Sequence, residues 1–113
     1  MKNTLKPLVS LTIVLLASAT PAWSAADTPQ VALTLAPSKE NPRNSEGDFI
    51  TLKDGRILFI YTHFTGGGSD HATAHLASRF SDDGGKSWSD QDKVVMENDG
   101  KQNIMSVSLL RLQ

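Results

Sequence analysis

The sequence predicts an all-β fold made of short antiparallel strands. Two turn signals separate its apolar runs, namely Lys53-Asp54-Gly55 and the polar stretch from Ser81 to Trp88. An Asp-Gly pair between apolar runs is the strongest short signal for a β-hairpin. The apolar runs themselves have the length of strands and are short for helices. We therefore expect hairpins in series, which form an antiparallel meander.

The expected strands follow the chain in order. Residues 72–80 are expected as a strand, although Ala74 to Ala77 would also suit a helix, and Val31 to Leu35 is a further short candidate strand. After four strands a fifth begins another unit, since residues 49–52 and 107–110 occupy equivalent places. The five strands are expected at residues 48–52, 56–63, 72–80, 93–96 and 105–112.

Residues 1–26 have the three parts of a secretory signal peptide. A basic start with two lysines precedes an apolar core, and small residues follow it. The core is too short to cross a membrane, so we expect cleavage after Ser24 or Ala26 and a secreted or periplasmic product. The mature part, residues 27–113, then has no membrane association.

Composition and residue spacing argue against a disulfide-bonded, a nucleic-acid-binding or a metal-binding protein. There is no cysteine, so export brings no disulfide. The mature part keeps 9 basic and 12 acidic residues, a net charge of −3, and a nucleic-acid partner is not expected. His71 and His75 have helical metal-ligand spacing, but on a strand their imidazoles would lie about 13 Å apart. We therefore expect neither a metal nor a cofactor.

The stretch from Ser81 to Trp88 reads Ser-x-Asp-x-Gly-x-Ser-Trp. Its glycines allow positive φ, and Ser81 and Asp83 can close a tight loop through hydrogen bonds to nearby backbone. Trp88 offers a large apolar anchor with one N–H donor, so we expect it to be buried and to staple the hairpin. The stretch resembles the Asp-box, a structural turn that recurs in sialidases and related β-propellers.

The resemblance extends to the residues that precede the box. In sialidases an arginine precedes the innermost strand of the first blade, and an aspartate follows that blade's second strand. Arg43 and Asp70 match them in order and approximate spacing. Over residues 41–112 the resemblance implies a six-bladed β-propeller, of which this chain forms the first four-stranded blade and the start of the second. Because a propeller needs about four to eight blades, we expect an N-terminal part of a longer protein, and the alternative is a complete small β domain.

The resemblance also implies an exo-acting glycoside hydrolase that releases terminal sialic acid or a related sugar from glycans. Arg43 matches the first of three arginines that bind the sugar carboxylate, and Asp70 matches the general acid/base. In a meander, the start of the first strand and the loop after the second lie at one end of the sheet. Arg43, Glu46 and Asp70 can therefore share one rim, where Glu46 is a candidate substrate-binding residue, while the box lies at the opposite end.

The chain also departs from the family. Asn44 and Ser45 follow Arg43 where the family has Ile-Pro, which leaves the identity of the sugar open. The family's other two arginines, nucleophilic tyrosine and partner glutamate have no counterpart, since Tyr61 lies early and within a strand. We therefore expect the chain to be inactive alone.

Each candidate residue has a simpler interpretation. Arg43 and Asp70 can be ordinary loop charges, and Glu46 can cap a turn. The alternative function is a non-catalytic Asp-box β-propeller that binds glycan or protein.

Overall fold

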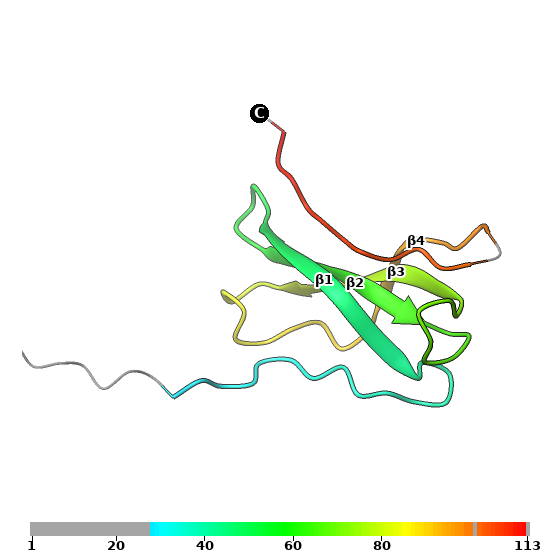
Figure 1. Cartoon of the computed structure of the whole chain (residues 1–113). Coiled ribbons are helices and arrows are strands. Elements are labelled where there is room, and N and C mark those ends of the chain that lie inside the picture. The colour runs from blue at the N-terminus through cyan, green and yellow to red at the C-terminus, as the bar shows by residue number, and fades with distance from the viewer. Residues whose placement is uncertain (1–27, 101, 113) are drawn as a thin grey trace, which may run out of the picture.

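The computed structural model describes residues 28–100 and 102–112. Within that part the chain forms one four-stranded antiparallel sheet and no helix. The strands lie side by side in the order of the sequence (Figure 1), which confirms the all-β class and the meander. The predicted signal peptide lies outside the described residues. The strands are β1 (Arg43–Thr51), β2 (Ile57–Phe64), β3 (Ala74–Ser81) and β4 (Lys93–Met96).

Strand β1 begins at Arg43, five residues earlier than the predicted Asp48. The early part stays in the sheet through a β-bulge, where the register with β2 shifts between Ser45 and Gly47. Glu46, the extra residue, takes a positive φ of 30°. Gly47 suits the bulge because a Cβ there would lie 2.4 Å from the Phe59 ring. The bulge thus lets a polar segment extend β1 as far as Arg43.

Two predicted strands are absent from the described residues. Residues 31–35 and 105–112 are irregular rather than strands, so the prediction of a fifth strand is wrong here. The backbone of each segment forms a hydrogen bond with a side chain of β1 rather than a ladder with the backbone of a neighbouring strand. The carbonyl of Leu35 accepts a hydrogen bond from the Asn44 side chain at 3.2 Å, and Leu109 N–H donates to the Asp48 carboxylate at 2.8 Å. A strand needs a row of backbone partners, and these contacts do not supply one.

The helical alternative for residues 74–77 is also settled. Strand β3 pairs with β2 along its whole length, from Ala74 opposite Phe64 to Ser81 opposite Ile57. Because β2 is an interior strand, its backbone N–H and C=O groups need partners along both edges, and residues 74–81 supply one of these two ladders. Tertiary pairing therefore overrides the helical propensity of a short alanine-containing segment.

The sheet has two different faces. Alternate residues of β2 point to opposite sides, and Ile60, Thr62 and Phe64 share the face that the C-terminal segment crosses. The C-terminal segment begins next to the first residue of β3, where Ile104 N–H donates to the Ala74 carbonyl at 3.3 Å. It then crosses to β1, where it contacts Asp48 (Figure 1). On this face Thr62 and Phe64 are completely buried.

The opposite side of the sheet is the aromatic face. Its members are Phe49, Phe59, Tyr61, His63 and Trp88. Phe59 stacks between Phe49 and Tyr61, with ring centroids 4.4 and 5.1 Å away. Phe49 nevertheless keeps 56% of its surface exposed. The core of the described chain is therefore narrow and centred on β2.

The turn from Ser81 to Trp88 closes on itself through side chains. Ser81 Oγ accepts from the Gly85 N–H at 2.8 Å and donates to Asp83 at 2.9 Å. Asp83 in turn accepts from the N–H and the hydroxyl of Ser87, at 2.9 and 2.6 Å. These hydrogen bonds, led by the Ser87 hydroxyl, lower the pKa of Asp83 to about 2. The predicted role of Ser81 and Asp83 in closing the loop is confirmed.

Trp88 differs from the prediction in its burial. Its indole N–H has the expected single partner, the Gly85 carbonyl at 3.1 Å, but the side chain is only half-buried. The ring meets Phe59 edge-on, with centroids 6.1 Å apart, and lies at the margin of the aromatic face. Because nothing among the described residues covers that margin fully, the tryptophan anchors the turn without full burial.

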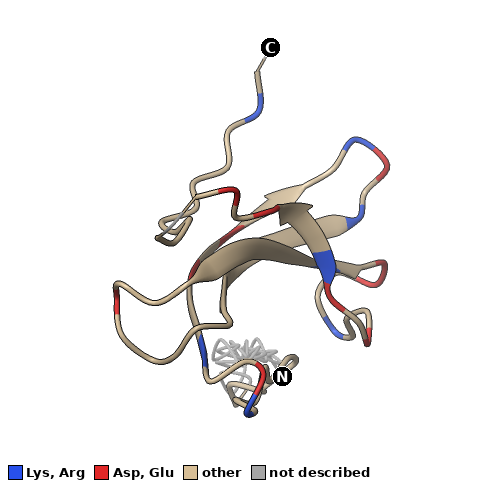
Figure 2. Ribbon diagram, turned by 90° about the vertical axis from the view of Figure 1, so that its right-hand side faces the viewer, with Lys and Arg blue, Asp and Glu red and all other residues tan. Residues whose placement is uncertain are grey.

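Charged residues of both signs are distributed over the turns and strand ends (Figure 2). Among the described residues, no helix has the length and apolar character needed to cross a membrane.

Candidate functional site

Four positions form a row across one end of the sheet. Arg43 pairs with Phe64, Phe64 pairs with Ala74, and Ala74 makes an isolated bridge to Asn103. The opposite end contains the β1–β2 turn and the Asp-box-like turn. The arrangement confirms the topological expectation that Arg43 and the loop after β2 share one end, away from the box. We call this end the rim site and define it by Arg43, Phe64, Gly68, Asp70 and Asn103.

Arg43 and Asp70 form the centre of the rim site. Arg43 Nη1 lies 2.5 Å from Asp70 Oδ1 and 3.2 Å from the Gly68 carbonyl oxygen. The guanidinium carbon also sits 4.6 Å from the centroid of the Phe64 ring, which supports the cation from below. The hydrogen bond and charge of Arg43 lower the pKa of Asp70. The Asp70 side chain remains 71% exposed, so a ligand can approach it from solvent.

The glycine-rich loop between β2 and β3 places Asp70 next to Arg43. Its base is closed by the N–H groups of Thr65 and Gly66, which both donate to the Thr73 carbonyl, at 2.8 and 3.1 Å. A Cβ on Gly66 would lie 2.8 Å from the Thr73 nitrogen, so only glycine fits there. A further turn, with Ala72 N–H donating to the Ser69 carbonyl at 3.0 Å, presents Asp70 at the tip.

Glu46 is not joined to this pair. Its carboxylate accepts a hydrogen bond of 3.5 Å from the neighbouring Ser45 hydroxyl, and no hydrogen bond or ion pair links it to Arg43 or Asp70 among the described residues. It lines a separate shallow hollow with Leu35, Phe59 and Tyr61. The structure therefore brings together two of the three predicted site residues, and the bulge at Glu46 turns the third aside.

Asn103 is a member of the rim site that the sequence did not reveal. Its side-chain N–H donates to the backbone carbonyl of Asp70, and its neighbour Ile104 bonds to Ala74. In a meander the loop that follows the fourth strand, residues 97–103, also lies at this end of the sheet. A single asparagine in a polar loop, however, carries no motif that would mark it.

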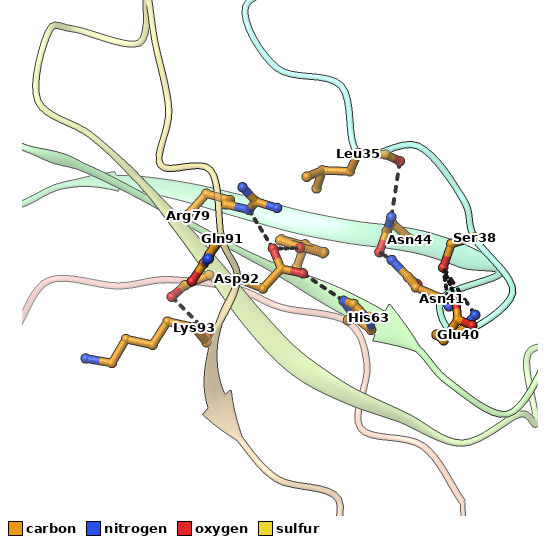
Figure 3. A network of polar contacts seen from close by, with 12 residues as sticks. Leu35, Ser38, Glu40, Asn41, Asn44, His63, Arg79, Gln91, Asp92 and Lys93 are labelled. Carbon is orange, nitrogen blue, oxygen red and sulfur yellow. Dashed lines mark hydrogen bonds and ion pairs between the residues drawn. The ribbon is translucent and has the colours of Figure 1, made fainter.

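A second polar cluster lies on the aromatic face and centres on Asp92. Its carboxylate accepts hydrogen bonds from the Tyr61 hydroxyl at 2.5 Å and from Arg79 Nε at 2.5 Å, and it lies 3.1 Å from His63 Nδ1. Figure 3 shows Arg79 and His63 approaching the carboxylate from two sides. This cluster ties the segment before β4 to strands β2 and β3.

The protonation states in the cluster follow from its contacts. Burial raises the pKa of Asp92, but hydrogen bonds from Tyr61 and Arg79 outweigh it, so the pKa lies below its ordinary value. Burial first, and then the stacked His75 ring 4.6 Å away, lower the pKa of His63. At neutral pH His63 is therefore uncharged, with Nδ1–H directed at an ionised Asp92.

Tyr61 has the wrong environment for a nucleophile. It is 2% exposed, and burial together with the Asp92 hydrogen bond raises its pKa. A nucleophilic tyrosine needs an accessible hydroxyl and a lowered pKa. Its position agrees with the interpretation that Tyr61 does not serve as the catalytic tyrosine.

Within the described part of the chain, no three histidine, cysteine or acidic side chains converge as metal ligands. His71 and His75 are in different settings, since His71 is exposed in the loop and His75 belongs to β3. Comparison of the chain with protein-family models, with curated proteins and with solved structures found no match.

Proposed function

We propose that this chain forms the first blade of a sialidase-like β-propeller, an exo-glycoside hydrolase that releases a terminal sugar acid such as sialic acid. The observation that carries the proposal is the ion pair between Arg43 and Asp70, which are 27 positions apart in the chain. An arginine beside an aspartate on an exposed rim provides a carboxylate-binding group next to a group that can transfer protons.

Arg43 has the properties of a carboxylate receptor. Its guanidinium is planar, stays charged at every working pH and can bind a carboxylate through two parallel hydrogen bonds. The Phe64 ring beneath it and the Gly68 carbonyl beside it restrict the orientations that the guanidinium can adopt. A receptor held in this way loses less entropy when a ligand binds.

Asp70 occupies the position that the incoming carboxylate would take. When a sugar acid binds to Arg43, it displaces Asp70 and leaves that carboxyl beside a second negative charge. Loss of a cationic partner and gain of an anionic neighbour both raise a carboxyl pKa. Asp70 then takes up a proton, which it can donate to the oxygen of the leaving group. Ligand binding thus converts an ionised aspartate into a general acid.

A non-catalytic glycan- or protein-binding propeller is the second candidate. In this candidate Asp70 stays ionised when the ligand binds and does not act as an acid. The two candidates differ in whether the pKa of Asp70 rises after the ligand binds.

The first test measures binding of N-acetylneuraminic acid by calorimetry, with a neutral N-acetylhexosamine for comparison. We expect Arg43→Lys to weaken binding of the sugar acid about tenfold, since lysine cannot make the two-point contact. Arg56→Lys is a matched control, because Arg56 pairs with Asp54 at 2.8 Å and lies over the Phe80 ring at the opposite end of the sheet. Equal effects of the two substitutions would contradict the proposed site.

The second test separates the enzyme from the binding protein. The complete gene product is incubated with a sialylated glycoconjugate, and free sugar acid is measured. Release that is reduced in Arg43→Lys but not in Arg56→Lys supports the hydrolase. Binding of the sugar acid without any release supports the non-catalytic alternative.

A further inference from the structure

We propose that Asn103 is a positioning residue that holds Asp70 at the rim site when a ligand carboxylate takes its place on Arg43. This inference rests on the proposed function. It assigns a role to the loop between β4 and the C-terminal segment.

Asp70 is held from two sides by groups of different kinds. Arg43, on β1, binds its side chain through Nη1. Asn103, beyond β4, binds its backbone carbonyl through the side-chain amide. Only the first of these contacts involves the carboxylate, so only the first is broken when a ligand displaces Asp70 from Arg43.

Asn103 is itself fixed to the sheet. It forms a bridge with Ala74, the first residue of β3, and the next residue, Ile104, donates to the Ala74 carbonyl at 3.3 Å. Ala74 is fully buried and pairs with Phe64 of β2. The amide that reaches Asp70 therefore projects from a backbone that the rigid part of the sheet supports.

The loop that carries Asp70 needs such a support. Its backbone hydrogen bonds close the base at Thr73 and one turn at Ser69 and Ala72, and the Asp70 side chain extends into solvent. Once its ion pair is broken, a solvent-exposed loop residue samples many positions. A general acid must stay within hydrogen-bond reach of the leaving oxygen, and a displacement of about 1 Å can cost about 10²-fold in rate. The bond from Asn103 limits that displacement.

The test compares Asn103→Ala and the nearly isosteric Asn103→Leu with Asn98→Ala. Asn98 is a matched control, because its side-chain amide donates to the Gln102 carbonyl in the same loop and does not contact Asp70. Two quantities are measured in the complete gene product, namely the pKa of Asp70 by carboxyl NMR and the kinetics on a sialylated substrate.

In the free protein, both Asn103 variants should move the pKa of Asp70 upward, toward its ordinary value of 3.8, because the loop holds the ion pair less firmly. In kinetics, kcat should fall about 10- to 100-fold while KM does not rise, since Asp70 also competes less for Arg43. If Asn103 only stabilised the fold, its loss would not lower kcat while leaving KM unchanged or lower.

An Asp70 pKa that is the same in wild type and both Asn103 variants would overturn the inference. So would an equal shift in Asn98→Ala. Because the NMR titration needs no substrate, it remains decisive if the protein proves to hydrolyse nothing, whereas the hydrolysis assay on wild type tests the proposed function alone.

Discussion

The hydroxyl of Tyr61 donates a 2.5 Å hydrogen bond to the carboxylate of Asp92, 31 positions later in the chain. Arg79 binds the same oxygen at 2.5 Å and also donates to the Ser89 carbonyl. Through these bonds the segment between the box and β4 lies across the aromatic face rather than in solvent. Strand β4 is the shortest strand of the sheet, with four residues. The hydrogen bonds of Asp92 to Tyr61 and Arg79 therefore help to hold the segment before β4 against strands β2 and β3.

Asp92→Asn should destabilise the protein by about 2 kcal/mol, because hydrogen bonds to a charged acceptor are worth more than neutral ones and Arg79 loses its anion. The free energy of unfolding is measured by urea titration. Asp90→Asn is the control, since Asp90 is exposed and the described structure gives its side chain no partner. Equal stability of the two variants would show that the Asp92 cluster is not a support of the sheet.

His63 should make the protein sensitive to mild acid. Its pKa in the folded state lies below 6.5, the ordinary value that the unfolded chain retains. As pH falls through about 6.5, the unfolded chain takes up the proton first, so the free energy of unfolding decreases. His63→Gln should lose less stability than wild type between about pH 7.5 and 5.5, measured by thermal unfolding. His71→Gln, in an exposed loop, should behave like wild type.

The sequence predicted the sheet because its signals are local. The Asp-Gly turn, the apolar run at residues 57–61 and the box each specify a hairpin or a strand without help from distant residues. Strand β4 was placed at its observed bounds, Lys93–Met96. The sequence also predicted that Arg43 and Asp70 lie at the same end of the sheet, because strand direction in a meander alternates whatever the side chains are.

The rest depends on contacts that sequence spacing does not encode. The bulge at Glu46 needs the Phe59 ring packed against Gly47, and it changes which way Glu46 faces. Asp92 acquires its role from Tyr61 on β2 and Arg79 on β3. Asn103 reaches Asp70 only because its backbone returns to the start of β3. Isolated polar residues of this kind carry no pattern.

Trp88→Ala should cost about 2 kcal/mol of unfolding free energy, less than the roughly 3–5 kcal/mol typical of a fully buried tryptophan, because the ring is half-buried. Trp88→Phe keeps most of the apolar contact and loses the bond to the Gly85 carbonyl, so about 1 kcal/mol is expected. Denaturant titration gives both values. Neither substitution should alter sugar-acid affinity, since the box lies at the other end of the sheet; a large change in affinity would contradict that separation.

Asp70→Asn tests the proposed chemistry most directly. The amide keeps the size of the side chain but cannot transfer a proton, so turnover of a natural glycoside, whose leaving group needs protonation, should fall about 10²–10⁴-fold. An activated aryl glycoside, whose leaving group needs little protonation, should be cleaved at nearly the wild-type rate in its glycosylation step. Binding of the sugar acid should be retained or strengthened, because the carboxylate that occupies Arg43 has been removed.

Asp54→Asn provides the matched control for this substitution, since it removes the acidic partner of Arg56 at the opposite end of the sheet. Its effect on both glycosides should be small. The decisive measurement is the ratio of kcat/KM between the natural and the activated glycoside, after thermal unfolding has shown that each variant is folded. Equal and small losses on both substrates for Asp70→Asn would remove Asp70 from the acid/base role. Because Arg43 would still bind the carboxylate, the non-catalytic propeller would then be the better account of the rim site.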